Sequence, residues 1–265
     1  MAKKRADVVL FEKGLVESRE KAKRVIMEGA VFVGTNRVDK PGESIDETAE
    51  IWIKKNPIKF VSRGGLKLEK AISNFDIDLN NVIAMDMGAS TGGFTDCMLK
   101  EGAKKVYAVD VGYGQLDWKL RQDDRVIVKE RTNIRYMETT EIDDKLDFVS
   151  IDVSFISLKH ILPVAFKLLK EDGKIVALIK PQFEAGRDKV GKKGIVKDKA
   201  VHKEVIINVL NFSEKLLLYP VGLTFSPITG TTGNVEFLAC FSKAENHISD
   251  EAIDIVIEEA HIKLK

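Results

Sequence analysis

Short apolar runs recur along the middle of the chain, and their spacing constrains the fold more than any other feature. Each run is bounded by glycine or charged residues, and helix-length segments separate one run from the next. This alternation is typical of βαβ units, in which crossover helices join parallel strands. The pattern therefore predicts an α/β domain with a Rossmann-like, doubly wound sheet. The predicted strands span residues 82–87, 106–110, 126–128, 148–152 and 175–179.

The end of the chain departs from this alternation. Two strand-like runs, residues 219–226 and 235–241, are separated only by a loop rich in glycine and threonine. They are close enough in sequence to pair as an antiparallel hairpin at the edge of the sheet. Beyond them, Ser249 can begin a helix whose apolar residues recur at helical spacing. We therefore expect a seven-stranded sheet with an antiparallel last strand, and a final helix that packs back on it.

The first part of the chain predicts a separate, small α+β unit. Ser18 can cap a helix that ends at Gly29, and short strands follow over residues 31–33 and 50–53. The lysines, asparagine and proline that come next indicate a linker. We therefore expect two domains, residues 1–56 and residues 57–265.

Several classes of protein are excluded by what the sequence lacks. No apolar run approaches the roughly 20 residues that cross a bilayer, and the charged start is followed by no apolar signal region. We therefore expect a cytoplasmic protein. Cys97 and Cys240 lie far apart and the histidines are scattered, so we expect free core thiols, no disulfide framework and no metal site.

A glycine-rich turn, residues 86–94, follows the first predicted strand of the larger domain. Because its side chains are small, a ligand can approach backbone N–H groups at the sheet edge where open α/β folds bind ligands. Asp110 follows the next strand, where a ribose hydroxyl pair needs a carboxylate acceptor. The spacing fits neither a dinucleotide fingerprint nor a triphosphate-binding loop. From the residues alone, the turn is either a cofactor site or a tight structural turn.

Four segments resemble the motifs of the TlyA-type ribosomal RNA 2′-O-methyltransferases, a family also called hemolysin A. They are residues 86–96, 110–116, 149–158 and 179–184. The resemblance extends over nearly the whole chain, and residues 5–42 resemble an S4 RNA-binding domain.

The resemblance implies an FtsJ-like methyltransferase that uses S-adenosyl-L-methionine to methylate a ribose 2′-hydroxyl, of cytidine, in ribosomal RNA. Ribosomal RNA or ribosomal subunits are then its partners, and rRNA processing is its context. The cofactor-binding residues implied by the family motifs are Asp86, Gly88, Ala89, Ser90, Thr91, Gly92, Gly93, Phe94, Asp110 and Val111.

The related FtsJ-type enzymes use a Lys-Asp-Lys-Glu tetrad, which falls here on Lys67, Asp152, Lys180 and Glu236. Asp152 and Lys180 each end a predicted parallel strand, so both face the crevice beside the glycine turn. A ribose 2′-hydroxyl is a poor nucleophile, and it needs a base or a cation that stabilises its oxyanion. We interpret Lys180 as either of these, held by Asp152, while Glu236 orients Lys67 or the ribose. Which member of the tetrad is the base stays open.

Basic residues concentrate at the amino-terminal end. The first 70 residues contain 16 Lys and Arg against 11 Asp and Glu, whereas the rest contains 26 against 30. Contacts of such residues with phosphates make RNA binding salt-dependent. A further basic stretch, residues 187–194, is either a mobile loop over the substrate or a plain surface loop. With the S4 resemblance, the expected RNA-binding residues are Arg5, Ser18, Arg19, Lys21, Lys23 and Arg63.

Two other functions compete with this interpretation. One is an RNA-binding ribosome-assembly factor whose methyltransferase fold is inactive, and the intact glycine turn and tetrad argue against it. The other is a membrane-lytic hemolysin, as the second family name implies. That function calls for a spanning segment or a markedly amphipathic basic helix, and the sequence has neither.

Overall fold

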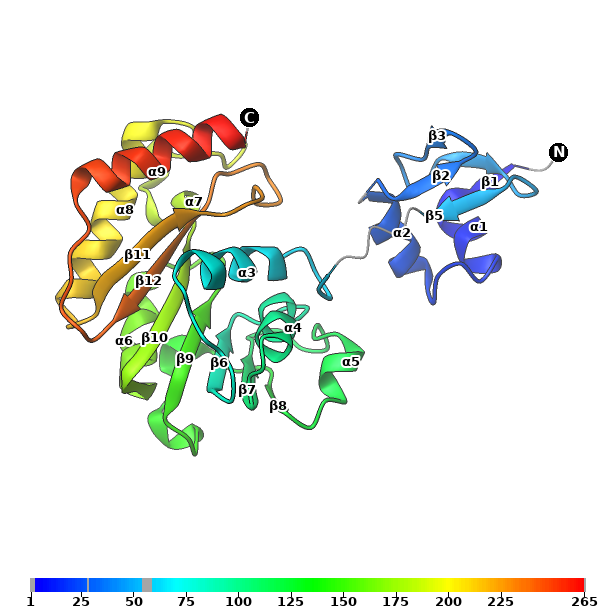
Figure 1. The fold of residues 1–265 in the computed structure, drawn as a ribbon. Coiled ribbons are helices and arrows are strands. Elements are labelled where there is room, and N and C mark those ends of the chain that lie inside the picture. The colour runs from blue at the N-terminus through cyan, green and yellow to red at the C-terminus, as the bar shows by residue number, and fades with distance from the viewer. Residues whose placement is uncertain (1–2, 28, 54–58, 265) are drawn as a thin grey trace. The chain divides into compact units, whose positions relative to one another are not determined.

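A computed structural model describes residues 3–27, 29–53 and 59–264 of the chain (Figure 1). It divides into two compact units, Met1–Ile58 and Lys59–Lys265, which are described separately below. The predicted linker, residues 54–57, lies outside the described residues.

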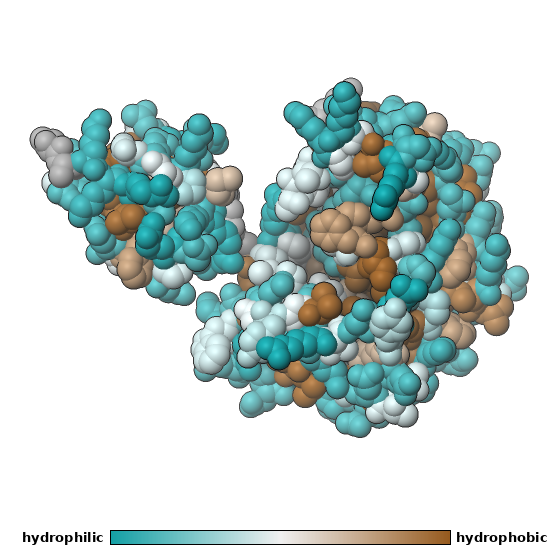
Figure 2. Space-filling view, turned by 180° about the vertical axis from the view of Figure 1, so that it is seen from behind, coloured by the Kyte–Doolittle hydropathy of each residue, from teal (hydrophilic) through white to brown (hydrophobic). Residues whose placement is uncertain are grey.

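The amino-terminal unit contains two small antiparallel sheets and two packed helices. Its elements are β1 (Lys3–Arg5), α1 (Ala6–Glu12), α2 (Arg19–Met27), β2 (Val31–Val33), β3 (Asn36–Arg37), β4 (Ser44–Asp46) and β5 (Ile51–Ile53). β1 pairs with β4, and β2 lies between β3 and β5. Leu10, Ile26 and Val31 are buried in its core. In the rear view of Figure 2, most of its surface is hydrophilic.

The predicted α2 and β2 are confirmed, and the Ser18 hydroxyl accepts a hydrogen bond from the Lys21 N–H at 3.1 Å. β1, α1 and β4 were not predicted. All three residues of β1 are exposed, so no hydropathy alternation marks this strand.

The larger unit contains a seven-stranded sheet in the order β11-β12-β10-β9-β6-β7-β8. Its strands are β6 (Ile83–Met87), β7 (Lys105–Val109), β8 (Val126–Lys129), β9 (Leu146–Ile151), β10 (Leu169–Ile179), β11 (Tyr219–Phe225) and β12 (Phe237–Ser242). β12 is antiparallel to both of its neighbours, whereas the pairs among β6 to β10 are parallel. The predicted fold class and the terminal hairpin are therefore confirmed.

Helices cover both faces of this sheet (Figure 1). The first face carries α3 (Gly65–Asn74), α4 (Gly93–Lys100) and α5 (Trp118–Arg121), and the second carries α6 (Leu162–Leu168), α8 (Lys199–Glu214) and α9 (Asp250–Lys263). Each face buries its own apolar cluster. Ser249 caps α9 as predicted, and both cysteines are buried and free. Short helices occupy connections: η1 (Ile134–Tyr136), η2 (Thr139–Glu141), η3 (Leu158–His160), α7 (Pro181–Glu184) and η4 (Arg187–Lys189).

The strand order reverses between β6 and β9, because the chain moves outward from β6 in one direction and from β9 in the other. A crevice at the carboxyl ends of the strands is the usual consequence of such a reversal. The glycine turn follows β6 and Asp152 follows β9, so both lie at this point. Among the described residues, no helix has both the length and the apolar character of a membrane span.

Candidate active site

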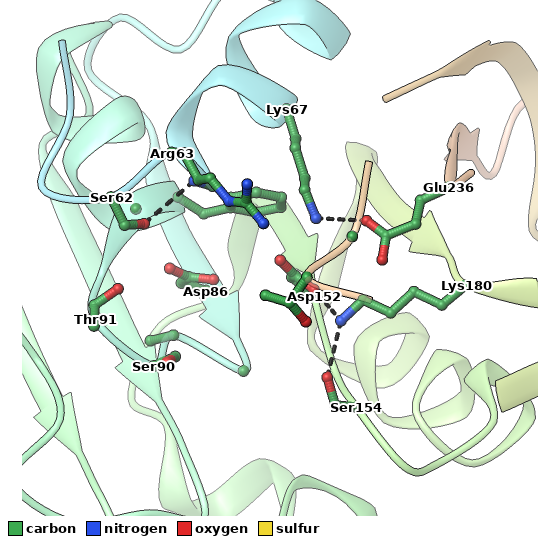
Figure 3. Close-up of a pocket in the computed structure, with 17 residues that line it drawn as sticks. Ser62, Arg63, Lys67, Asp86, Ser90, Thr91, Asp152, Ser154, Lys180 and Glu236 are labelled. Atoms are coloured by element: carbon green, nitrogen blue, oxygen red, sulfur yellow. Dashed lines mark hydrogen bonds and ion pairs between the residues drawn. The ribbon is translucent and has the colours of Figure 1, made fainter. Parts of the chain in front are cut away.

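A pocket of about 310 Å³ opens at this edge of the sheet (Figure 3). Its walls come from the start of α3, the glycine turn, the ends of β9 and β10, and the loop before β12. In Figure 3, Ser90 and Thr91 lie on one side of the pocket, and Lys180 and Glu236 lie on the other. The lining residues are Ser62, Arg63, Gly64, Lys67, Asp86, Gly88, Ala89, Ser90, Thr91, Gly93, Phe94, Asp152, Ser154, Lys180, Gly230, Thr231 and Glu236.

The glycine turn is shaped by close backbone approaches. Gly88 has a φ of +91°, and a Cβ there would lie 2.5 Å from the carbonyl oxygen of Asp152. A Cβ at Gly93 would lie 2.9 Å from the backbone nitrogen of Gly65, at the start of α3. Larger side chains would therefore push apart the elements that form the pocket.

Three of the predicted cofactor residues, Gly92, Asp110 and Val111, are not among the lining residues of the pocket. Asp110 nevertheless organises the turn, because its carboxylate accepts hydrogen bonds from the backbone N–H of Ser90 at 2.8 Å and of Gly112 at 2.7 Å. Each carboxylate oxygen has two lone pairs, so Asp110 can accept further hydrogen bonds.

Asp86 is a buried carboxyl group at the floor of the pocket. It accepts hydrogen bonds from the backbone N–H of Thr95 at 2.8 Å and from the Thr95 hydroxyl at 2.7 Å. Burial, aided by the negative charge of Asp152, outweighs these bonds and raises the pKa of Asp86 to about 7. The charge of this group therefore changes near neutral pH.

The structure brings the four predicted catalytic residues together as two ion pairs (Figure 3). Lys67 Nζ lies 2.6 Å from Glu236 Oε2, and their side chains are only 10% and 3% exposed. Lys180 Nζ lies 2.5 Å from Asp152 Oδ1 and donates a hydrogen bond to Ser154 Oγ at 3.0 Å. The approach to Asp152 Oδ1 lacks hydrogen-bond geometry, so that contact is ionic rather than a directed bond. Two ammonium groups thus face the same space, each held by a carboxylate.

An exposed aromatic side chain, that of Phe155, follows Asp152, and the sequence patterns gave it no role. Phe155 is 91% exposed and has a φ of +63°, which is strained for a bulky residue. Its ring centroid lies 4.9 Å from that of Phe183. The half-buried Glu184 holds the segment by accepting hydrogen bonds from Ser157 Oγ at 2.6 Å and the Leu158 N–H at 2.8 Å. The signal available in the sequence was an aromatic residue among the small and aliphatic residues that follow Asp152.

The predicted RNA-binding residues fall into two groups. Arg63 lines the pocket of the larger unit, and the other five lie in the amino-terminal unit. There, the buried Asp7 pairs with Arg5 at 2.9 Å and with Arg19 at 3.1 Å, and the Arg5 contact chiefly lowers the pKa of Asp7.

The remaining three residues of that group have different surroundings. Ser18 caps α2, Lys23 pairs with exposed Glu20 at 2.6 Å, and Lys21 is half-buried.

Comparisons with known proteins agree with this architecture. Residues 60–243 match the FtsJ-like methyltransferase family, and residues 4–51 match the S4 domain. The Bacillus subtilis protein YqxC, provisionally named an rRNA methyltransferase, is 53% identical over 269 residues, which cover 99% of this chain and 96% of the relative. The 16S/23S rRNA (cytidine-2′-O)-methyltransferase TlyA of Mycobacterium tuberculosis is 38% identical over 258 residues, 97% of this chain and 96% of the relative.

A solved structure from Streptococcus thermophilus, provisionally described as a hemolysin, has 48% sequence identity and a TM-score of 0.80, and the match covers 99% of this chain and 97% of the other. The resemblance drawn from the motifs is therefore confirmed. The chain belongs to the FtsJ-like methyltransferase family, among the relatives of TlyA, and carries an S4 domain amino-terminal to its methyltransferase domain.

Proposed function

We propose that this protein transfers a methyl group from S-adenosyl-L-methionine to the 2′-hydroxyl of a cytidine in ribosomal RNA. The observation that carries the proposal is the meeting of two lysine–carboxylate pairs, Lys67–Glu236 and Lys180–Asp152, in the pocket formed by the glycine turn. The TlyA relative is named for this activity. In this proposal, residues 1–56 bind RNA and residues 57–265 catalyse, in the cytoplasm where ribosomes are made.

The pocket suits a cofactor of this kind. Its volume of about 310 Å³ lies at the lower end of the range for small-molecule sites. The glycine turn lines the pocket with small residues, Asp110 can accept hydrogen bonds from ribose hydroxyls, and Asp86 offers negative charge to a cation. When bound, the cofactor would supply a methyl group activated by the sulfonium.

The two lysines have different tasks in this mechanism. Asp152 and Ser154 hold Lys180 in place, and they occupy two positions around its Nζ atom. The remaining N–H, or the lone pair of the neutral amine, can therefore contact the ribose oxygen. As an amine it accepts the proton of the 2′-hydroxyl, and as an ammonium it stabilises the oxyanion. Lys67 is paired with Glu236, whose side chain is only 3% exposed, and we assign this pair to orientation of the ribose.

The target nucleotide must leave its helix to reach the pocket. A flipped or single-stranded base needs a stacking surface, and aromatic side chains supply one. Phe155 lies three residues after Asp152 and presents its ring to solvent beside Phe183. We assign Phe155 to stacking on the base of the methylated nucleotide.

Transfer of tritium from labelled cofactor into ribosomal RNA tests the proposal. The wild-type protein should incorporate label, and mapping should place it on a cytidine 2′-oxygen. Lys180→Ala should abolish transfer, while the Kd of the cofactor changes by less than a few fold, on the order of 1 kcal/mol or less. Unchanged turnover in this variant would remove Lys180 from the mechanism. Tight RNA binding by the wild type without any transfer would favour the assembly-factor alternative.

A further inference from the structure

A second basic feature of the larger unit lies outside the pocket. Residues 189–198, which we call the lysine loop, connect η4 with α8 and line a hollow of about 430 Å³. Lys192, Lys193 and Lys197 are exposed, and within the described part of the chain they make no ion pair or side-chain hydrogen bond. The hollow therefore carries unneutralised positive charge.

Two other charged groups of the hollow are already engaged. Lys189 pairs with Glu204 at 2.6 Å. The carboxylate of Asp198 caps α8 by accepting a hydrogen bond from the backbone N–H of Ala200 at 2.8 Å. Neither group neutralises the three unpaired lysines.

The backbone of the lysine loop is firmly held. The buried Asn234 side chain accepts a hydrogen bond from the Val196 N–H at 2.9 Å and donates one to the Gly194 carbonyl at 2.8 Å. The buried His202 ring donates to the Val196 carbonyl at 3.1 Å. These contacts favour a fixed surface over a mobile loop, so little conformational entropy is lost when a ligand binds.

The same asparagine connects the lysine loop to the mouth of the pocket. The backbone carbonyl oxygen of Asn234 accepts a hydrogen bond from the Gly230 N–H at 2.9 Å, and Gly230 lines the pocket. A Cβ at Gly230 would lie 2.5 Å from Glu236 Oε1, so this segment approaches the catalytic carboxylate closely. Asn234 therefore joins the lysine loop on one side to the segment that lines the pocket on the other.

We infer that the lysine loop binds phosphates of the RNA strand beside the target nucleotide. This inference rests on the proposed function. Ammonium groups without an apolar anchor suit a phosphate backbone better than a protein partner, whose interface needs buried aromatic or aliphatic side chains. The one apolar residue among the loop's lining side chains, Ile195, is half-buried.

A triple variant, Lys192→Gln, Lys193→Gln and Lys197→Gln, tests the inference. Its KM for ribosomal RNA should rise roughly ten-fold, and the magnitude of the slope of log affinity against log salt should fall by about two, since each of the three contacts with a single strand contributes about 0.7. The matched control replaces three exposed lysines near the amino ends of the strands, Lys104, Lys167 and Lys215, by glutamine. The control should behave as the wild type does.

A second variant separates the charge of the loop from its position. Asn234→Ala keeps all three lysines but releases the loop, so KM for RNA should also rise. Asn246→Ala is its control, because it removes a single side-chain bond to the backbone, to the Pro220 carbonyl at 2.9 Å. The KM of this control should stay at the wild-type value.

An unchanged KM and an unchanged salt slope in the triple lysine variant would overturn the inference. RNA retention on filters, which needs no turnover, measures the same salt slope. If the wild type transfers no methyl group, the proposed function fails, but a difference in that slope between the variant and its control still supports the phosphate contacts.

Discussion

The two units of this protein use charged side chains in opposite ways. In the pocket, Lys67 and Lys180 are each only 10% exposed, and each ammonium is held against one carboxylate. In the amino-terminal unit, Arg5 and Arg19 are 54% and 51% exposed, although both contact the buried Asp7. Burial gives the pocket positional precision and makes its charges interdependent. Exposure leaves the arginines available to phosphates, with contributions that are small, additive and sensitive to salt.

The largest expected effect comes from breaking a buried pair. Lys67→Ala should lower kcat by about 10²-fold to 10⁴-fold and reduce the free energy of unfolding by about 3 kcal/mol, because Glu236 is left charged and enclosed. Urea unfolding and methyl transfer measure the two effects. The double variant Lys67→Met/Glu236→Leu should recover most of the stability and none of the activity. Recovered activity would show that the pair is structural only.

A pH series tests how the ionisation of the buried Asp86 affects cofactor binding. Its pKa of about 7 means that the carboxyl ionises between about pH 6 and about pH 8, and a cationic cofactor favours the ionised form. The Kd of the cofactor should therefore fall by up to about ten-fold across that interval. Asp86→Asn should remove the dependence, and isothermal titration checks both proteins. A pH dependence that survives in the variant would assign the titration to another group.

The same shift has a consequence for stability. Because the folded pKa of Asp86 is raised above the ordinary value of 3.8, the folded state holds the proton more tightly than the unfolded chain. This group therefore favours folding fully below about pH 4, and its contribution is lost as the pH rises through about 7.

Phe155 tests whether the segment after Asp152 stores backbone strain. Phe155→Ala should lower kcat/KM about ten-fold, the cost of one lost stacking contact. Phe155→Gly should lose the same activity. Its free energy of unfolding should nevertheless be about 1 kcal/mol higher than that of Phe155→Ala, because glycine accepts the positive φ without strain. Phe155→Tyr is the conservative control and should retain most activity. A glycine variant no more stable than the alanine variant would contradict the strain.

The smallest effect is expected in the amino-terminal unit. Arg19→Gln should weaken RNA binding a few fold, by less than about 1 kcal/mol, and reduce the salt slope by about one. Turnover at saturating RNA should not change, because the exposed guanidinium takes no part in the chemistry. A matched control is Arg37→Gln, whose guanidinium pairs with exposed Asp39 at 2.6 Å. A large loss of kcat in Arg19→Gln would break the division between the two units.

Much of the fold was predictable because its signals are local. The apolar runs located β6, β7, β8, β9, β11 and β12 to within two residues, and the hairpin at the sheet edge followed from its short loop. β10 begins at Leu169, six residues before its prediction, because polar and glycine residues interrupt its first half. The tetrad and the glycine turn came from family motifs, which residue identity alone can reveal.

The remainder of the site depends on contacts between distant segments. Ser154 holds Lys180 across 26 positions, and Asn234 holds Val196 across 38. Neither residue carries a local pattern that marks its role, since a serine or an asparagine in a loop is ordinary turn chemistry.

The sequence by itself determined the order of strands and helices, the turn that lacks side chains, and the types of residue available for catalysis. The Lys180–Asp152 pair was expected from the family motifs and is present. Only the tertiary structure decided that Glu236 meets Lys67, one of the two partners expected for it, across 169 positions. The physical reason is that hydropathy period and glycine content act within a few residues, whereas partner choice among charged groups depends on how both faces of the sheet pack. That packing sets which two side chains come within bonding distance, and which side chains, like that of Lys192, have no partner among the described residues.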